Sequence, residues 1–253
     1  MKRIILTVLI AALFFSLCAC GSAVDDQATQ DSAAIRTNFD AACAYVKSQV
    51  DTSEMTSTTR EEGNGMYQYW TYSGEGTNEV GTDVNISGKT VTLSKTTVND
   101  LKELGFEVDL TLETIKPDAV QGFTIKKGKK FCGLAIHNLS DKEADPADLP
   151  IFQFTGGSDD ESLDYAYNGI KKDSTLKDVI YALDIPKSNI TISGDVSGTT
   201  IVLNYVDSAT EDGVAVTDSL DIYMRYNPKK NNATVTNLNL VRYETDISDN
   251  TAE

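Results

Sequence analysis

One amphipathic segment opens the patterned part of the chain, between residues 35 and 50. Its apolar side chains recur every three or four positions, which is the spacing that places them on one face of an α-helix. They are Ile35, Phe39, Ala42, Cys43, Val46 and Val50. The pattern predicts a first helix of about four turns.

From residue 66 onward, apolar and polar positions alternate over short segments, which is the period of β-strands. Turn signals rich in glycine and asparagine separate these segments, and two pairs of them, at residues 84–93 and 123–138, are predicted hairpins. The remaining predicted strands span residues 66–72, 107–115, 149–155, 199–206, 219–227 and 233–243. We therefore expect most of this region to be strand.

Two short helices are predicted between the strands, and each begins with a capping signal. Thr97 and Asp100 have the spacing of a capping box, and Ser174 or Thr175 caps the second helix. The helices begin 78 residues apart, and strands follow both of them. This repetition suggests a tandem duplication of one unit, a helix followed by an antiparallel sheet.

The chain begins with a hydrophobic segment that differs from all the others. Lys2 and Arg3 precede an unbroken apolar run from Ile4 to Leu17, which is 14 residues long. A transmembrane helix needs about 20 apolar residues to cross the hydrocarbon of a bilayer. The run is therefore predicted to be a secretory signal peptide.

The residues Leu17-Cys18-Ala19-Cys20 close this run. They resemble the lipobox of bacterial lipoproteins, in which a branched apolar residue and a small residue precede the cysteine that becomes the new N-terminus. The resemblance implies that Cys20 carries a diacylglyceryl thioether, whose two acyl chains hold a protein stably on a membrane. Cys18 would leave with the signal peptide, because the residue before it is Leu17 rather than a small one. An ordinary secretory signal with cysteines nearby is the alternative.

The body of the chain resembles known tandem structures. Within residues 80–245, a helix of the kind DSTLKDVIYALDIP runs into three antiparallel strands. This pattern is similar to the units of the β-lactamase inhibitor protein, of the small outer-membrane assembly lipoproteins SmpA and OmlA, and of surface lipoproteins from Gram-positive bacteria. The resemblance implies a non-catalytic protein that uses a sheet face for contact. The chain departs from the inhibitor by lacking the cysteine pairs within its domains.

Together these patterns predict an α+β fold with two tandem units, in which short helices pack on antiparallel sheets. The predicted organisation is a signal peptide (residues 1–19), a lipidated flexible tether (20–34), the N-terminal helix with the first unit (35–155), the second unit (156–245) and a polar tail (246–253). The tether is small and polar and contains no aromatic residue, which is typical of flexible linkers.

The charge of the chain argues against nucleic-acid binding. There are 22 basic and 38 acidic residues, for a net charge of −16. Cleavage after residue 19 would lower the charge to −18, because it removes Lys2 and Arg3 but no acid. Binding to a phosphate backbone needs clustered Lys and Arg side chains, and a strongly negative protein repels such a partner.

No complete catalytic or metal-binding motif is present in the sequence. The single histidine, His137, closes a predicted strand, and no GxSxG motif accompanies it. Metal sites need several Cys and His ligands at short spacing, and apart from the predicted lipidated Cys20 only Cys43 and Cys132 remain after the predicted cleavage. Both cysteines follow apolar patterns and are expected to be buried and free, with a disulfide between them as the alternative. We therefore expect no catalytic residue, no metal and no cofactor.

One predicted strand stands out by its aromatic content. Tyr67, Tyr69, Trp70 and Tyr72 all lie within residues 66–72. Flat amphipathic rings of this kind stack on sugars and on protein partners, so these four residues are the candidate partner-binding site. Packing in the core is the alternative, because the side chains of a strand alternate between its two faces.

The sequence thus predicts a lipoprotein held on the outer, extracytoplasmic face of the cell membrane through Cys20. There it is expected to act as a non-catalytic binding or cell-envelope interaction module, whose partner is a protein or a cell-wall glycan. Two alternatives are open. One is an extracellular hydrolase that acts on glycan or peptidoglycan through a pair of carboxylates. The other is an inhibitor of a secreted hydrolase.

Overall fold

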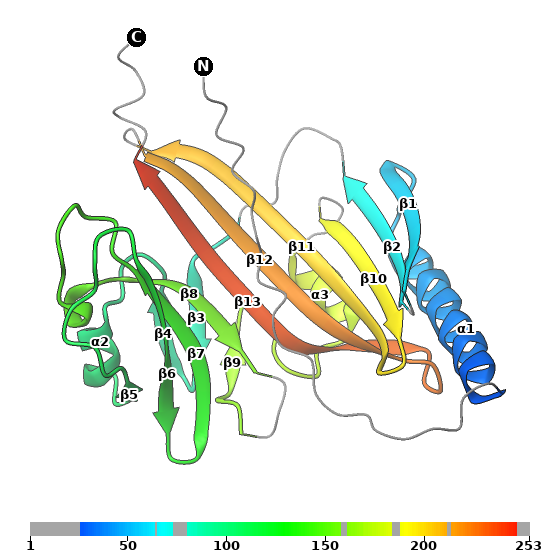
Figure 1. Cartoon of the computed structure of the whole chain (residues 1–253), viewed down its shortest axis with the longest axis horizontal. Coiled ribbons are helices and arrows are strands. Elements are labelled where there is room, and N and C mark those ends of the chain that lie inside the picture. Colours follow the sequence, from blue (N-terminus) through cyan, green and yellow to red (C-terminus); the bar gives the residue numbers. More distant parts are fainter. Residues whose placement is uncertain are drawn as a thin grey trace, which may run out of the picture.

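A single large antiparallel sheet dominates the computed structural model, which describes residues 26–63, 65–72, 80–157, 161–183, 188–211 and 214–246. Cys20 and the predicted signal peptide lie outside these residues. The sheet has ten strands in the order β1-β2-β10-β11-β12-β13-β8-β7-β6-β5 (Figure 1). They are β1 (Met55–Glu62), β2 (Gly65–Tyr72), β5 (Glu107–Asp109), β6 (Val120–Lys127), β7 (Lys130–His137), β8 (Ile151–Gly156), β10 (Asn189–Asp195), β11 (Gly198–Glu211), β12 (Val214–Asn227) and β13 (Asn232–Asp246).

A small second sheet and the helices complete the described structure. The small sheet has the order β4-β3-β9 and consists of β3 (Asp83–Ile86), β4 (Lys89–Thr92) and β9 (Tyr165–Ala166). The helices are α1 (Asp26–Gln49), α2 (Val98–Glu103) and α3 (Leu176–Leu183), with a short 3-10 helix η1 (Pro146–Asp148). α1 begins nine residues before its predicted start at Ile35, so part of the expected tether is helical.

The predicted α+β fold, with short helices on tandem sheets, is wrong. The described chain is 54% strand and only 18% helix. The strands that follow α2 and those that follow α3 are joined edge to edge, because β8 pairs with β13 around Phe154↔Leu240. The hairpin of β1 and β2, which lies in the predicted first unit, pairs instead with β10 around Trp70↔Ile190. All of these strands therefore belong to one sheet.

Several local features of the sequence prediction are confirmed. β3 and β4 form the hairpin predicted at residues 84–93, and the two residues of its turn, Ser87 and Gly88, both have positive φ. Two-residue hairpins with this backbone geometry match the twist of the flanking strands. β6 and β7 form the second predicted hairpin, in which Gly128 has positive φ, a conformation that glycine adopts without strain.

The large sheet has two chemically different faces, because the side chains along each strand point alternately to one face and to the other. The inner face is apolar, and its central side chains are at most 2% exposed. They include Trp70, Leu203, Ile222, Leu240 and Phe154. The outer face carries the intervening residues, most of which are polar in the central strands.

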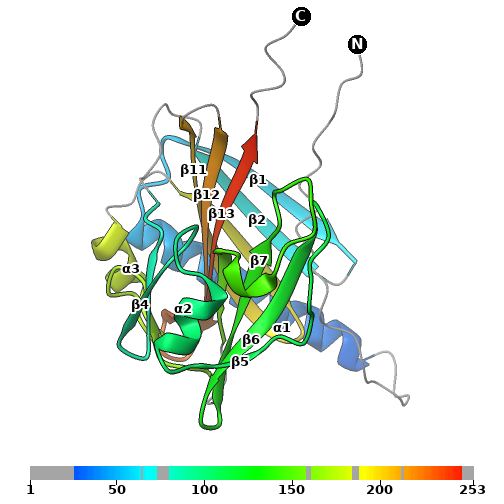
Figure 2. The same cartoon turned by 90° about the vertical axis from the view of Figure 1, so that its left-hand side faces the viewer.

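The helices and the small sheet pack on the inner face. The side chain of Phe39 in α1 lies over Gly194 of β10, where an added Cβ atom would be 3.2 Å from it. The small sheet makes contact through Tyr165, whose ring centroid is 5.6 Å from that of Phe154. Figure 2 shows α3 and β4 on the same side of β11, β12 and β13. The apolar core is therefore a layer between the inner face and these elements.

Asp100 and Asp178 cap the two short helices in the same way. The backbone N–H of Thr97 donates to Asp100 Oδ2 at 2.8 Å, and that of Thr175 donates to Asp178 Oδ2 at 2.7 Å. The threonine hydroxyls accept from the aspartate N–H groups in return, both at 3.2 Å. Thr175, rather than Ser174, is thus the cap of α3. These backbone and side-chain hydrogen bonds favour the ionised carboxylates and lower the pKa of Asp100 and Asp178.

We expect this capping to fail in acid. A carboxyl whose pKa is lowered by folding stabilises the folded chain fully above the unfolded pKa of about 3.9, and the stabilisation is lost as the pH falls through the folded pKa. Carboxyl carbon shifts followed by NMR should therefore show Asp100 and Asp178 titrating at lower pH than aspartates of the denatured chain. Asp178→Asn should remove the contribution of this carboxyl to the pH dependence of the free energy of unfolding. An ordinary midpoint for both aspartates would contradict the prediction.

Candidate binding surface

The four aromatic residues of the predicted site do not lie together. Trp70 is 2% exposed and belongs to the inner face, where Lys47 Nζ lies 5.8 Å from the centroid of its ring. Tyr72 lies on the same side of the sheet. Tyr67 and Tyr69 lie half-buried on the outer face. Only two of the four rings can therefore contact a partner on the outer face. Trp70 packs in the core, which was the alternative interpretation of this strand.

Tyr67 and Tyr69 stand side by side at one end of the outer face. Their ring planes differ by 11° and their centroids are 6.3 Å apart. The guanidinium carbon of Arg60 lies 5.8 Å from the centroid of Tyr69. These contacts restrict the motion of the two rings, so the protein loses less side-chain entropy when a ligand binds to them.

Polar side chains cross the middle of the outer face in a line. Asn204, Asp221, Asn239 and Thr155 are successive cross-strand partners on β11, β12, β13 and β8. Asn204 Nδ2 donates to Asp221 Oδ1 at 2.6 Å. Asn239 Oδ1 accepts from Gln153 Nε2 at 2.9 Å and from Thr155 Oγ1 at 3.1 Å. We call these five residues the amide row.

Some of the hydrogen-bonding capacity around the amide row is unused. Asp221 is only 7% exposed, and among the described residues only its Oδ1 atom receives a hydrogen bond. The nearby Asn237 Oδ1 is buried and receives none from the described part of the chain. Burial, together with the charge of Asp221, raises the pKa of Tyr223, so this hydroxyl stays a donor. The surface can therefore both donate to and accept from a ligand.

Sequence reasoning missed the amide row, although the sequence carries a signal for it. Three strands each contain an asparagine or aspartate between two apolar residues. These segments are Leu203-Asn204-Tyr205, Leu220-Asp221-Ile222 and Leu238-Asn239-Leu240. When the flanking residues face the core, the polar residue between them must face the opposite side. The alignment of the three segments depends on strand register, which the sequence does not give.

A small apolar cluster borders the amide row on the outer face. The ring centroids of His137 and Tyr243 lie 5.9 Å and 5.6 Å from that of Phe152. His137 ends β7, where the sequence placed it, and its Nε2 atom lies 3.1 Å from Oδ1 of the exposed Asp118. The cluster itself consists of Ala135, Phe152 and Val241.

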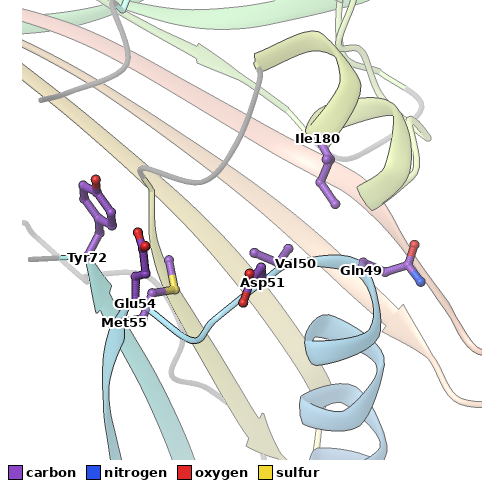
Figure 3. Close-up of a pocket in the computed structure, with 7 residues that line it drawn as sticks. All are labelled: Gln49, Val50, Asp51, Glu54, Met55, Tyr72 and Ile180. Carbon is purple, nitrogen blue, oxygen red and sulfur yellow. The ribbon is translucent and has the colours of Figure 1, made fainter. Parts of the chain in front are cut away.

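A cavity of about 350 Å³ lies on the other side of the sheet, between α1, the β1-β2 hairpin and α3 (Figure 3). The backbone N–H of Ser53 donates to Asp51 Oδ1 at 3.0 Å, which lowers the pKa of Asp51. Asp51 and Glu54 both line the cavity, so its electrostatic potential disfavours an anion. The full lining is Gln49, Val50, Asp51, Glu54, Met55, Tyr72 and Ile180.

Cys43 and Cys132 are both free, as predicted, so the alternative of a disulfide between them is wrong. Cys132 is buried as expected, whereas Cys43 is only half-buried. Burial raises the pKa of Cys132 to about 12 and is the main cause that raises the pKa of Cys43 to about 11. Both thiols are therefore protonated and unreactive at neutral pH.

Membrane-spanning helices and metal clusters can be assessed only for the residues that the structure describes. Among these residues, no helix is both long and apolar enough to cross a membrane. Within the same ranges, no three His, Cys, Asp or Glu side chains lie close enough together to hold a metal ion. No protein-family model, curated protein or solved structure matches this chain.

Proposed function

We propose that this protein is a lipid-anchored, extracytoplasmic binding module that contacts its partner through the outer face of the large sheet and catalyses no reaction. The asymmetry of the sheet is the observation that carries this proposal. α1 and the small sheet pack on the apolar inner face, whereas none of the described helices packs on the amide row. A polar outer face is usual for an antiparallel sheet that packs on one side only. The informative groups on this face are the buried ones, Asp221 at 7% exposure and Asn237 Oδ1, which receives no hydrogen bond from the described residues.

The anchor would hold the folded body close to the bilayer. Five residues, 21–25, separate Cys20 from the first residue of α1. At most about 3.6 Å per residue is available in an extended chain, so the thioether and the helix start lie within roughly 20 Å of each other. α1 then packs on β10 and β11. An acylated Cys20 would therefore keep the folded body next to the membrane, with the outer face on the side of the sheet opposite to α1.

Cys20→Ala tests the anchor. We expect this variant to lack the diacylglyceryl group and to move from the membrane fraction to the soluble fraction, because one thioether carries both acyl chains. Cys18→Ala is the matched control and should stay acylated and membrane-bound. Mass spectrometry of the mature N-terminus and ultracentrifugation give the two readouts. Acyl labelling that persists in Cys20→Ala would refute the anchor.

A bulky charge on the outer face tests the binding role. In the full-length Cys20→Ala protein, Asn204→Arg should weaken co-sedimentation with the cell-wall fraction at least about tenfold, because the longer guanidinium side chain would pair with the neighbouring Asp221 and cover the centre of the amide row. Asn99→Arg, at an exposed position of α2, is the matched control and should bind like the parent protein. Equal binding by the two variants would exclude the outer face. Soluble fragments whose release Asp221→Asn abolishes would favour a hydrolase instead.

A further inference from the structure

We infer that the ligand of the outer face is an uncharged glycan chain that lies across the strands along the amide row. This inference rests on the proposed binding function and adds the chemical class of the ligand. Charge, hydrogen-bonding capacity and the shape of the apolar surface support it independently of one another.

The centre of the outer face is nearly free of charge. A second line of cross-strand partners runs beside the amide row. It consists of Tyr69, Thr191, Val202, Tyr223 and Asn237. Asp221 is the one charged side chain in either line, although the chain has 38 acidic and 22 basic residues. A polyanion would meet this carboxylate with no cation in either line to oppose it, and a cationic partner would find no second carboxylate. Electrostatic complementarity therefore favours an uncharged ligand.

The amide row offers one hydrogen-bonding position on each successive strand. Neighbouring strands lie about 4.7–4.9 Å apart, which is comparable to the length of one sugar ring in an extended glycan. Asn239 accepts two hydrogen bonds through Oδ1, while its Nδ2 group donates to none of the described residues. The Oδ2 atom of Asp221 likewise receives no hydrogen bond from them. The row thus has a free acceptor on β12 and a free donor on the neighbouring β13, and sugar hydroxyls can pair with both.

Asn237 contributes a further hydrogen-bond acceptor to the outer face, its side-chain oxygen. Its Oδ1 atom is buried and receives no hydrogen bond from the described residues, an arrangement that is unfavourable for a protein at rest. Tyr223 is its cross-strand partner and lies between it and Val202. A ligand hydroxyl that enters beside the Tyr223 ring would supply the missing donor, while the ring contacts the apolar side of the sugar.

A folded protein partner fits this surface less well. Protein interfaces are built around aromatic or arginine anchors that enter desolvated pockets. The side chains of the apolar cluster on the outer face are already buried, with only 5–7% of their surface exposed, so they offer little surface to such an anchor. Tyr67 and Tyr69 stand at the end of the face rather than at its centre. The centre consists instead of amides and hydroxyls, which hydrogen-bond well to sugars.

Binding of defined oligosaccharides tests the inference. We expect the full-length Cys20→Ala protein to bind chitohexaose or cellohexaose saturably in calorimetry, and Asn239→Ala and Tyr223→Ala each to weaken this binding at least about tenfold. Asn99→Ala and Tyr181→Ala, at exposed positions of α2 and α3, are the matched controls and should bind like the parent. The affinity should be nearly equal at about 0.1 M and about 1 M salt, because salt screens only charges.

Failure of the inference is distinguishable from failure of the proposed function. No binding to either oligosaccharide, or binding that high salt abolishes, would overturn the glycan inference. If Asn204→Arg still weakens co-sedimentation with the cell wall in that case, the binding function stands and the partner is a protein. If both tests fail, the outer face is not a binding surface. Should circular dichroism show that a variant is unfolded, Thr155→Val removes a hydroxyl from the same row and takes its place.

Discussion

Trp70→Ala is expected to lower the free energy of unfolding by about 3–5 kcal/mol. The ring is 2% exposed, and its strand position pairs directly with Ile190 of β10. Lys47 of α1 lies over the ring at 5.8 Å from its centroid. Truncation to alanine would leave a cavity between α1 and the inner face, and the surrounding backbone can collapse into it only in part.

Tyr69→Ala is the matched control for this substitution. Tyr69 precedes Trp70 in the chain but lies half-buried on the outer face, so its loss should cost about 1 kcal/mol or less. Urea denaturation followed by circular dichroism measures both variants, because Trp70 is the single tryptophan and its removal abolishes tryptophan fluorescence. Similar losses for the two variants would show that the faces of β2 are assigned incorrectly.

The different roles of Trp70 and Tyr69 show how far a sequence pattern reaches. Period-two alternation already separates Tyr67 and Tyr69 from Trp70 and Tyr72, so the division of the aromatic residues between two faces is a local property. Which of the two pairs is buried depends on where α1 packs. The residues of α1 that make this contact lie about 20 positions away in the chain. A local pattern of apolar and polar residues does not predict which segments that far apart pack together.

Features that arise within about ten residues were predictable for the same reason. The hairpin at Ser87 and Gly88 and the capping pair Thr97 and Asp100 depend on neighbours in the chain, and the structure confirms both. The pairing of β8 with β13 joins residues such as Phe154 and Leu240, for which no local signal exists. The α+β prediction failed at this step, and the amide row, which crosses the same junction, was missed with it.

Gly156→Val is the second substitution with a large expected effect, and it tests this junction directly. Gly156 of β8 pairs with Leu238 of β13. A Cβ atom on Gly156 would lie 2.5 Å from Cε1 and 2.7 Å from Cζ of Tyr165, which is closer than packed carbon atoms approach. Tyr165 is 5% exposed and its ring contacts Phe154, so it has little room to move. We expect a loss of about 1–3 kcal/mol in the free energy of unfolding.

The matched control separates this clash from the general effect of valine in a strand. Gly122 of β6 is exposed, and the nearest atom to its added Cβ would be 4.0 Å away, so Gly122→Val should be neutral or slightly stabilising. In a Tyr165→Ala background, Gly156→Val should lower the free energy of unfolding by less than it does in the parent protein, because the ring that the valine displaces is absent. A cost that is unchanged in the double variant would mean that the small sheet does not pack on β8 at this point. The inner face would then be uncovered beside the junction, and the outer face would no longer be the distinctive surface of the sheet.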